Sequence, residues 1–114
     1  MLRDYRDYLD DIVTSCDKVQ EYTRGMDSER FVADDRTLRA VIHCMLVIGE
    51  ATKKLPLSLR RGHPDIPWKR LAGMRDKLIH EYFGIDTEIL WKAVQEDIPI
   101  LRERAGRIQA GLAE

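Results

Sequence analysis

"LRAVIHCMLVIGEATKKL", residues 38–55, is the most apolar stretch of the chain. Its apolar residues recur every three or four positions, which is the period of an α-helix. They form two stripes: Leu38, Val41, Ile42, Met45, Ile48, Gly49 and Thr52 make up one, and Ala40, Cys44, Val47 and Ala51 the other. A helix that is apolar on two sides must be covered on two sides. In a chain this short, a second copy is one candidate for the second cover.

Gly49 lies inside this predicted helix, where glycine costs about 1 kcal/mol relative to alanine. A close approach of another backbone would account for a glycine at this position. A glycine that is merely tolerated is the alternative.

The rest of the chain also follows a helical period. A first helix, with apolar residues from 2 to 19, should end near Gly25, and a short helical piece should cover residues 29–33. Pro56 ends the central helix, a third helix runs from about 65 to 82, and Asp86 or Thr87 caps a fourth. Pro99 interrupts the fourth helix and should kink or break it. These elements predict an all-α, four-to-five-helix up-and-down bundle in which residues 1–114 form a single domain.

The composition excludes several classes of protein. With 114 residues, 44% hydrophobic residues and a net charge of −1, the chain resembles a globular domain rather than a simple electrostatic DNA binder. No apolar run approaches the ~20 residues of a membrane span, and the acidic, polar start predicts no secretory signal. Cys16 and Cys44 lack metal-ligand spacing and form no ligand cluster with a histidine. We therefore expect free thiols in a reducing cytoplasm, with no metal and no cofactor.

Positive charge gathers in one part of the chain. Between residues 60 and 81 there are six Lys/Arg and three acidic residues, so this segment carries +3 and the remainder −4. Such a segment can present an anion-binding face. A solvated helix surface is the alternative.

The same segment contains "RDKLIHEY", residues 75–82, with Arg75, His80 and Tyr82 on one predicted helix. Helical geometry puts Arg75 and Tyr82 within roughly 20° of each other and His80 about 140° from Arg75. One helix does not aim the three side chains at a common point. Either the grouping is accidental, or the helix end or another chain completes a site.

These residue types suit metal-free cleavage of RNA, in which the 2′-hydroxyl attacks the neighbouring phosphate. Arg75 would stabilise charge on the phosphoryl oxygens, and His80 would transfer the proton. Tyr82 would orient the histidine or bind the substrate. Surface ion pairs, helix capping and core packing of Tyr82 are the structural alternatives.

The string Arg75-x-x-x-x-His80-x-Tyr82 resembles the R-x-x-x-x-H-x-Y signature of HEPN domains, specifically of the HepT-like toxins. Three longer blocks resemble that family in the same order: "VIGEATKKL" at 47–55, "HPDIPWKRLAGMRDKLIHEYFGID" at 63–86 and "LWKAVQEDIPILRER" at 90–104. The resemblance covers nearly the whole chain. It implies a HEPN-like helical bundle that forms a homodimer, with the motif helices lining a shared cleft.

The resemblance also implies a function. The protein would be a metal-independent endoribonuclease, the toxin of a type VII toxin–antitoxin pair, with an MNT-type nucleotidyltransferase antitoxin as its partner. The antitoxin would transfer AMP to Tyr82 and so neutralise the toxin.

Individual residues acquire roles from the same resemblance. Asp76 stands where the family favours a small polar residue, and we expect it to orient His80 one turn later. Lys69, Arg70 and Lys77 are candidate contacts for RNA phosphates. Glu50 and Lys53 are expected to be structural. A catalytically silent helical dimer that serves as a scaffold for the nucleotidyltransferase is the alternative function.

Overall fold

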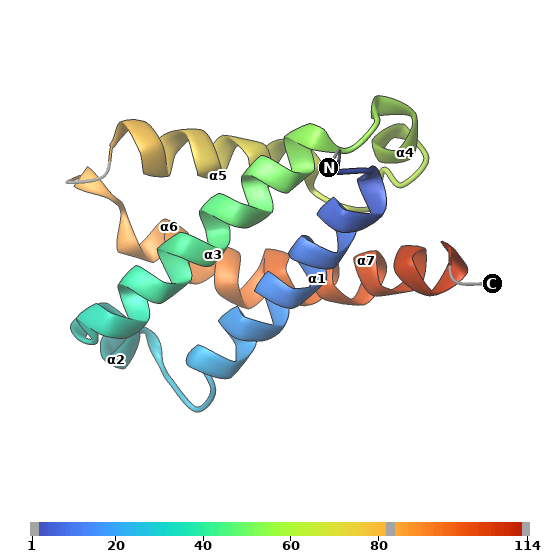
Figure 1. Ribbon diagram of the computed structural model, residues 1–114. Helices are drawn as coiled ribbons and strands as arrows, with labels where there is room; N and C mark the ends of the chain where they lie inside the picture. Colours follow the sequence, from blue (N-terminus) through green and yellow to red (C-terminus); the bar gives the residue numbers. More distant parts are fainter. Residues whose placement is uncertain (1–2, 82–83, 113–114) are drawn as a thin grey trace.

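The computed structural model describes residues 3–81 and 84–112. Within these ranges the chain forms helices and no β-strand, which confirms the all-α class (Figure 1). The first part contains α1 (Tyr5–Tyr22), α2 (Ser28–Ala33), α3 (Asp35–Lys54), α4 (Leu57–Arg61) and α5 (Trp68–His80). The second part is one continuous helical rod composed of α6 (Thr87–Lys92), η2 (Ala93–Asp97) and α7 (Ile98–Leu112).

Four long helical bodies and two short helices therefore build the fold, close to the predicted four-to-five-helix bundle. Successive long bodies run in opposite directions (Figure 1). The helix α3 contacts both α1 and α5, and α1 also contacts α7. Helix α3 therefore lies in the centre of the fold, as its two apolar stripes predicted.

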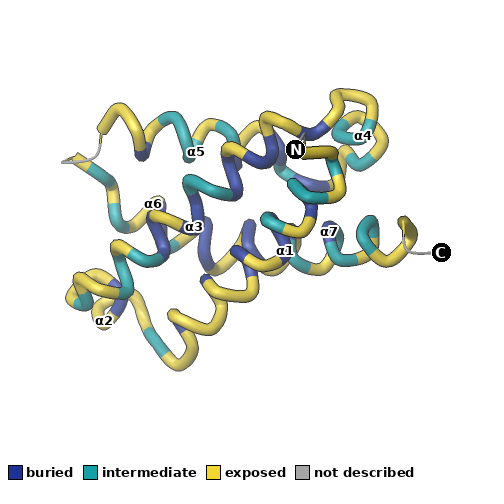
Figure 2. Tube along the Cα trace, in the orientation of Figure 1, coloured by how far each residue is buried: buried dark blue, intermediate teal, exposed yellow. Residues whose placement is uncertain are grey.

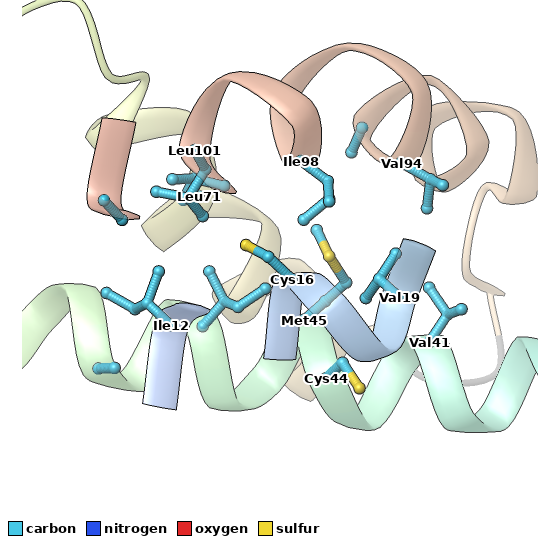
Figure 3. Packing of buried hydrophobic residues seen from close by; sticks show 14 of the residues in the cluster. Ile12, Cys16, Val19, Val41, Cys44, Met45, Leu71, Val94, Ile98 and Leu101 are labelled. Carbon is cyan, nitrogen blue, oxygen red and sulfur yellow. The ribbon is translucent and has the colours of Figure 1, made fainter. Parts of the chain in front are cut away.

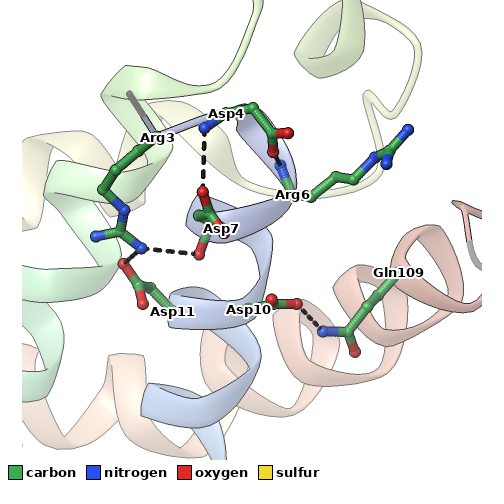
Figure 4. Close-up of polar contacts among 7 residues, drawn as sticks. All are labelled: Arg3, Asp4, Arg6, Asp7, Asp10, Asp11 and Gln109. Atoms are coloured by element: carbon green, nitrogen blue, oxygen red, sulfur yellow. Dashed lines mark hydrogen bonds and ion pairs between the residues drawn. The ribbon is translucent and has the colours of Figure 1, made fainter. Parts of the chain in front are cut away.

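Aspartates begin most of the long helices, because a carboxylate at the N-cap accepts from the unpaired backbone N–H groups of the first turn. Asp4 and Asp7 form a reciprocal capping box at α1, and the side chain of Gln109 links α7 to Asp10 of α1 (Figure 4). Asp34 caps α3, and Asp86 caps α6 as predicted.

The ends of the helices also follow local chemistry. After α1, Gly25 adopts a φ of 75°, a left-handed conformation that favours glycine, and this confirms the predicted stop. The third long helix is shorter than predicted: it begins at Trp68, after Pro67 at its N-cap, and ends at His80.

Pro99 does not break the fourth helix, because α7 runs through it. Instead a π-helical turn, η2, lies just before the proline, and the Ile98 N–H donates to the Ala93 carbonyl five residues back. Proline has no N–H to donate, and its ring crowds the carbonyl one turn earlier. A widened turn accommodates both effects without ending the helix.

The hydrophobic core lies between the long helices, and the buried positions follow their facing sides (Figures 2 and 3). Cys44 and Ala51, from the second apolar stripe of α3, are only 3% and 2% exposed. Ala40 and Val47 of the same stripe are only partly buried. Because α1 and α5 of the same chain flank α3, Cys44 and Ala51 need no second copy to cover them. The predicted homodimer stays a prediction.

Candidate active site

Helix α5 carries most of the predicted site residues, and its start is tied to the preceding loop. The indole Nε1–H of Trp68 donates to the carbonyls of Arg60 and His63, at 3.1 and 3.0 Å. The helix then packs against α3 through buried Leu71 and Leu78. This anchoring determines which α5 side chains face α3.

The two helices pack tightly at Gly49. A Cβ atom built on Gly49 would lie 2.1 Å from Cβ and 2.8 Å from Cγ of Arg75. The side-chain stem of Arg75 therefore occupies the space that any larger residue would fill. Of the two explanations for Gly49, the close approach is confirmed.

The guanidinium of Arg75 is held by two carboxylates. Its Nη2 lies 3.0 Å from Oε2 of Glu50 on α3, and its Nη1 donates to Oδ1 of Asp76 at 3.1 Å. The side chain of Arg75 is 27% exposed, whereas that of Glu50 is 48% exposed. The cationic end thus lies at the surface, between carboxylates from two different helices.

Asp76 is in turn anchored by a second cation. Nζ of Lys53 on α3 lies 2.6 Å from Oδ1 of Asp76. The hydrogen bond from Lys53, followed by that from Arg75, lowers the pKa of Asp76 below its ordinary value of 3.8. Two carboxylates and two cations form this cluster, so its formal charge is zero at neutral pH.

The predicted role of Asp76 in orienting His80 stays a prediction. In the described structure, Oδ1 of Asp76 contacts Lys53 and Arg75. These contacts show that Asp76 helps to orient the arginine.

His80 is the last residue of α5 and is exposed to solvent. Because α5 is a continuous α-helix from Arg75 to His80, the two residues are separated by about 7.5 Å along the axis and about 140° around it. The helical geometry predicted from the sequence is confirmed. The third motif residue, Tyr82, lies outside the described residues.

A groove of about 620 Å³ lies between α5 and the rod formed by α6, η2 and α7. It is lined by Arg70, Gly73, Met74, Lys77, Ile89, Lys92, Ala93, Glu96, Asp97 and Ile100. Of the three predicted RNA contacts, Arg70 and Lys77 line this groove, and Lys69 is exposed on the same helix.

The two cations that α5 contributes to the groove differ in their surroundings. Arg70 donates to the largely buried carboxylate of Asp97 at 2.7 Å, and this hydrogen bond raises the pKa of Arg70. Lys77 has no ion-pair partner among residues 3–81 and 84–112. Lys77 is thus the better placed of the two to bind a phosphate.

The described part of the chain lacks the features of two other kinds of site. In that part, no group of three or more His, Cys, Asp or Glu side chains is arranged to hold a metal ion. No helix there is long and apolar enough to cross a membrane. Cys16 and Cys44 are buried free thiols, as predicted.

Sequence comparison identifies the family. A profile described as "Ribonuclease HepT-like" matches residues 12–108. The chain belongs to the HepT-like ribonuclease family. It is 46% identical over 109 residues to a Thermococcus cleftensis protein named "Probable ribonuclease HepT", an alignment that covers 96% of this chain and 99% of that protein.

A second relative has a similar length and a similar name. The Methanocaldococcus jannaschii protein named "Putative RNase MJ0125" is 43% identical over 112 residues, which cover 98% of this chain and 97% of the relative. Among solved structures, none matches the chain. The predicted resemblance to HepT-like proteins is confirmed across nearly the whole of this HepT-like chain.

The sequence interpretation missed the contribution of Glu50 and Lys53, which it assigned to structure alone. Both contact the motif helix, Glu50 through Arg75 and Lys53 through Asp76. The sequence signal for this contribution was the nearness of Glu50 and Lys53 to Gly49. Where a glycine lets two helices pack tightly, its charged neighbours come next to the opposite helix.

Proposed function

We propose that this protein is a metal-independent endoribonuclease in which Arg75 and His80 carry out the cleavage of RNA. The observation that carries the proposal is the position of Arg75: its stem lies on Gly49 and its guanidinium is held at the surface by two carboxylates, in a chain of the HepT-like ribonuclease family. A guanidinium fixed in this way is suited to a phosphate in a defined orientation.

The reaction needs no group beyond those of the protein and the RNA. His80 accepts the proton of the 2′-hydroxyl, the 2′-oxygen attacks the adjacent phosphorus, and the bond to the 5′-oxygen breaks. His80 then gives this proton to the departing 5′-oxygen, and the other product ends in a 2′,3′-cyclic phosphate. Arg75 stabilises the charge that develops on the non-bridging oxygens.

The separation of Arg75 and His80 around α5 supports a site shared between two copies. In a homodimer with two-fold symmetry, the motif helices face each other, and His80 of one copy approaches Arg75 of the other. Lys77, Arg70 and Lys69 would then bind flanking RNA phosphates. The mass of the protein in solution, measured by light scattering after gel filtration, tests this arrangement.

In the cell, the enzyme would act as the toxin of a HEPN/MNT pair. A nucleotidyltransferase antitoxin would transfer AMP from ATP to the hydroxyl of Tyr82, with release of pyrophosphate. The added AMP, with its anionic phosphate, would be attracted to Arg75 and would block the site to RNA. Incubation with the nucleotidyltransferase and ATP should add the mass of AMP to the wild type and not to Tyr82→Phe.

One observation favours a second function, a catalytically silent partner of the nucleotidyltransferase. Because carboxylates already neutralise Arg75, the cluster around it has no excess positive charge to attract RNA. In this case the dimer would bind the partner without cutting RNA.

The decisive experiment is incubation of partner-free protein with total RNA in EDTA. Cleavage by the wild type and not by His80→Ala establishes the nuclease, and intact mass spectrometry verifies that the sample lacks AMP. The matched control is His63→Ala, because His63 makes its contact to Trp68 through its backbone carbonyl, which the substitution retains. Equal cleavage by wild type and His80→Ala would refute the role of His80. An unmodified wild type without activity would favour the silent partner.

A further inference from the structure

The ion pair between Arg75 and Glu50 joins the motif helix to a residue that lies 25 positions earlier in the chain. It connects Nη2 of Arg75 to Oε2 of Glu50 at 3.0 Å, while Nη1 donates to Asp76 at 3.1 Å. The two carboxylates thus bind different nitrogens of one planar group. A planar group held at two of its ends cannot rotate freely about its long axis.

Each of the two carboxylates has its own support. Asp76 is fixed by Lys53, whose Nζ lies 2.6 Å away. Glu50 follows Gly49, which packs against the stem of Arg75. The guanidinium offers five N–H donors, more than these two contacts use, and so remains able to donate to a phosphate.

We propose that Glu50 is a positioning residue for RNA cleavage, which acts by holding the Arg75 guanidinium in the orientation that binds the scissile phosphate. The inference rests on the proposed function and adds a residue from outside the R-x-x-x-x-H-x-Y string. Glu50 does not contact the substrate. Its negative charge repels RNA phosphate, so its contribution to the rate comes through Arg75.

Kinetics of Glu50 variants separate positioning from simple repulsion. Glu50→Ala should lower kcat about tenfold, because a misplaced catalytic group costs rate, while KM changes less than about twofold. Glu50→Gln retains an oxygen acceptor and should lose only about threefold. The control is Glu21→Ala, which removes an exposed carboxylate from α1 and should leave both constants unchanged.

The fold should tolerate these substitutions, because ion pairs between partly exposed side chains contribute little to stability. A faster reaction or a lower KM in Glu50→Ala would overturn the proposal, since repulsion alone would then describe the role of Glu50.

Coupling to Arg75 provides a second test. In an Arg75→Lys background with residual activity, Glu50→Ala should have no further effect on kcat, because the group it positions is gone. An undiminished tenfold loss in that background would overturn the proposal.

A spectroscopic test does not depend on nuclease activity. In ¹⁵N-labelled protein, the Arg75 Nε–H resonance should be resolved in the wild type and should broaden or shift in Glu50→Ala. If the wild type cuts no RNA, the proposed nuclease function fails, and this resonance alone decides whether Glu50 holds Arg75. An unchanged resonance in Glu50→Ala would overturn the positioning role.

Discussion

Replacing Gly49 with alanine should force α3 and α5 apart where Gly49 packs against Arg75. The added Cβ would lie 2.1 Å from Cβ of Arg75 and 3.2 Å from the backbone carbonyl oxygen of Leu71. Neither atom can move independently of the α5 backbone, because Cβ is bonded to it and the carbonyl belongs to it. Rotation of the Arg75 side chain therefore cannot relieve the contact.

The size of the effect follows from two opposing terms. Overpacking costs about 1–3 kcal/mol, and a contact with the backbone of a packed helix belongs at the upper end. Alanine recovers about 1 kcal/mol through its higher helix propensity, which leaves a net destabilisation of about 2 kcal/mol. For 114 residues the unfolding entropy is about 0.24 kcal/mol/K, so Tm should fall by about 8 °C.

Gly73→Ala is the matched control, because it makes the same change on the partner helix. A Cβ on Gly73 meets no atom within 4 Å, so only the propensity term remains and Tm should rise by about 2–4 °C. Thermal and urea unfolding followed by circular dichroism measure both variants. If Gly49→Ala is as stable as Gly73→Ala, the close approach of α3 and α5 at Gly49 is refuted.

Three further predictions follow from buried and paired groups. Burial raises the pKa of Cys16 from 9.0 to about 12. The stability that depends on its protonated thiol should therefore be complete below pH 9 and decrease as the pH rises toward 12. Over this range the urea midpoint should fall less in Cys16→Ala than in the wild type. Lys53→Met should raise the pKa of Asp76 toward 3.8, because it removes the stronger of the two hydrogen bonds that lower this pKa. In the wild type, the stabilisation from the ionised Asp76 is present above pH 3.8 and disappears as the pH falls through the lower pKa of the folded state. A carboxyl-carbon NMR titration that finds the same Asp76 pKa in both proteins would contradict this prediction. Leu71→Ala should cost about 2–5 kcal/mol in urea unfolding because Leu71 is buried, whereas Leu57→Ala at an exposed position should cost less than about 0.5 kcal/mol.

Local features of the sequence predicted local features of the fold. The aspartates at 34 and 86 begin helices because a carboxylate satisfies backbone N–H groups a few residues away. Gly25 ends a helix because it tolerates a positive φ. Pro99 did not break its helix, because a π-helical turn just before it accommodates the proline.

The candidate site was predictable only in part. The spacing of Arg75 and His80 implied their offset around one helix, and the structure retains it because α5 is continuous. The contact of Asp76 with Lys53 was not predictable from spacing, because Lys53 belongs to another helix.

By itself, the sequence determined most of the helix ends, which faces of the helices are apolar, and that α3 must be covered on two sides. Only the tertiary structure decided that α1 and α5 of the same chain provide that cover and that Glu50 meets Arg75. The physical reason is that an apolar stripe requires burial without specifying the partner surface. The partner depends on where helices cross, and here the crossing is set by the missing side chain of Gly49.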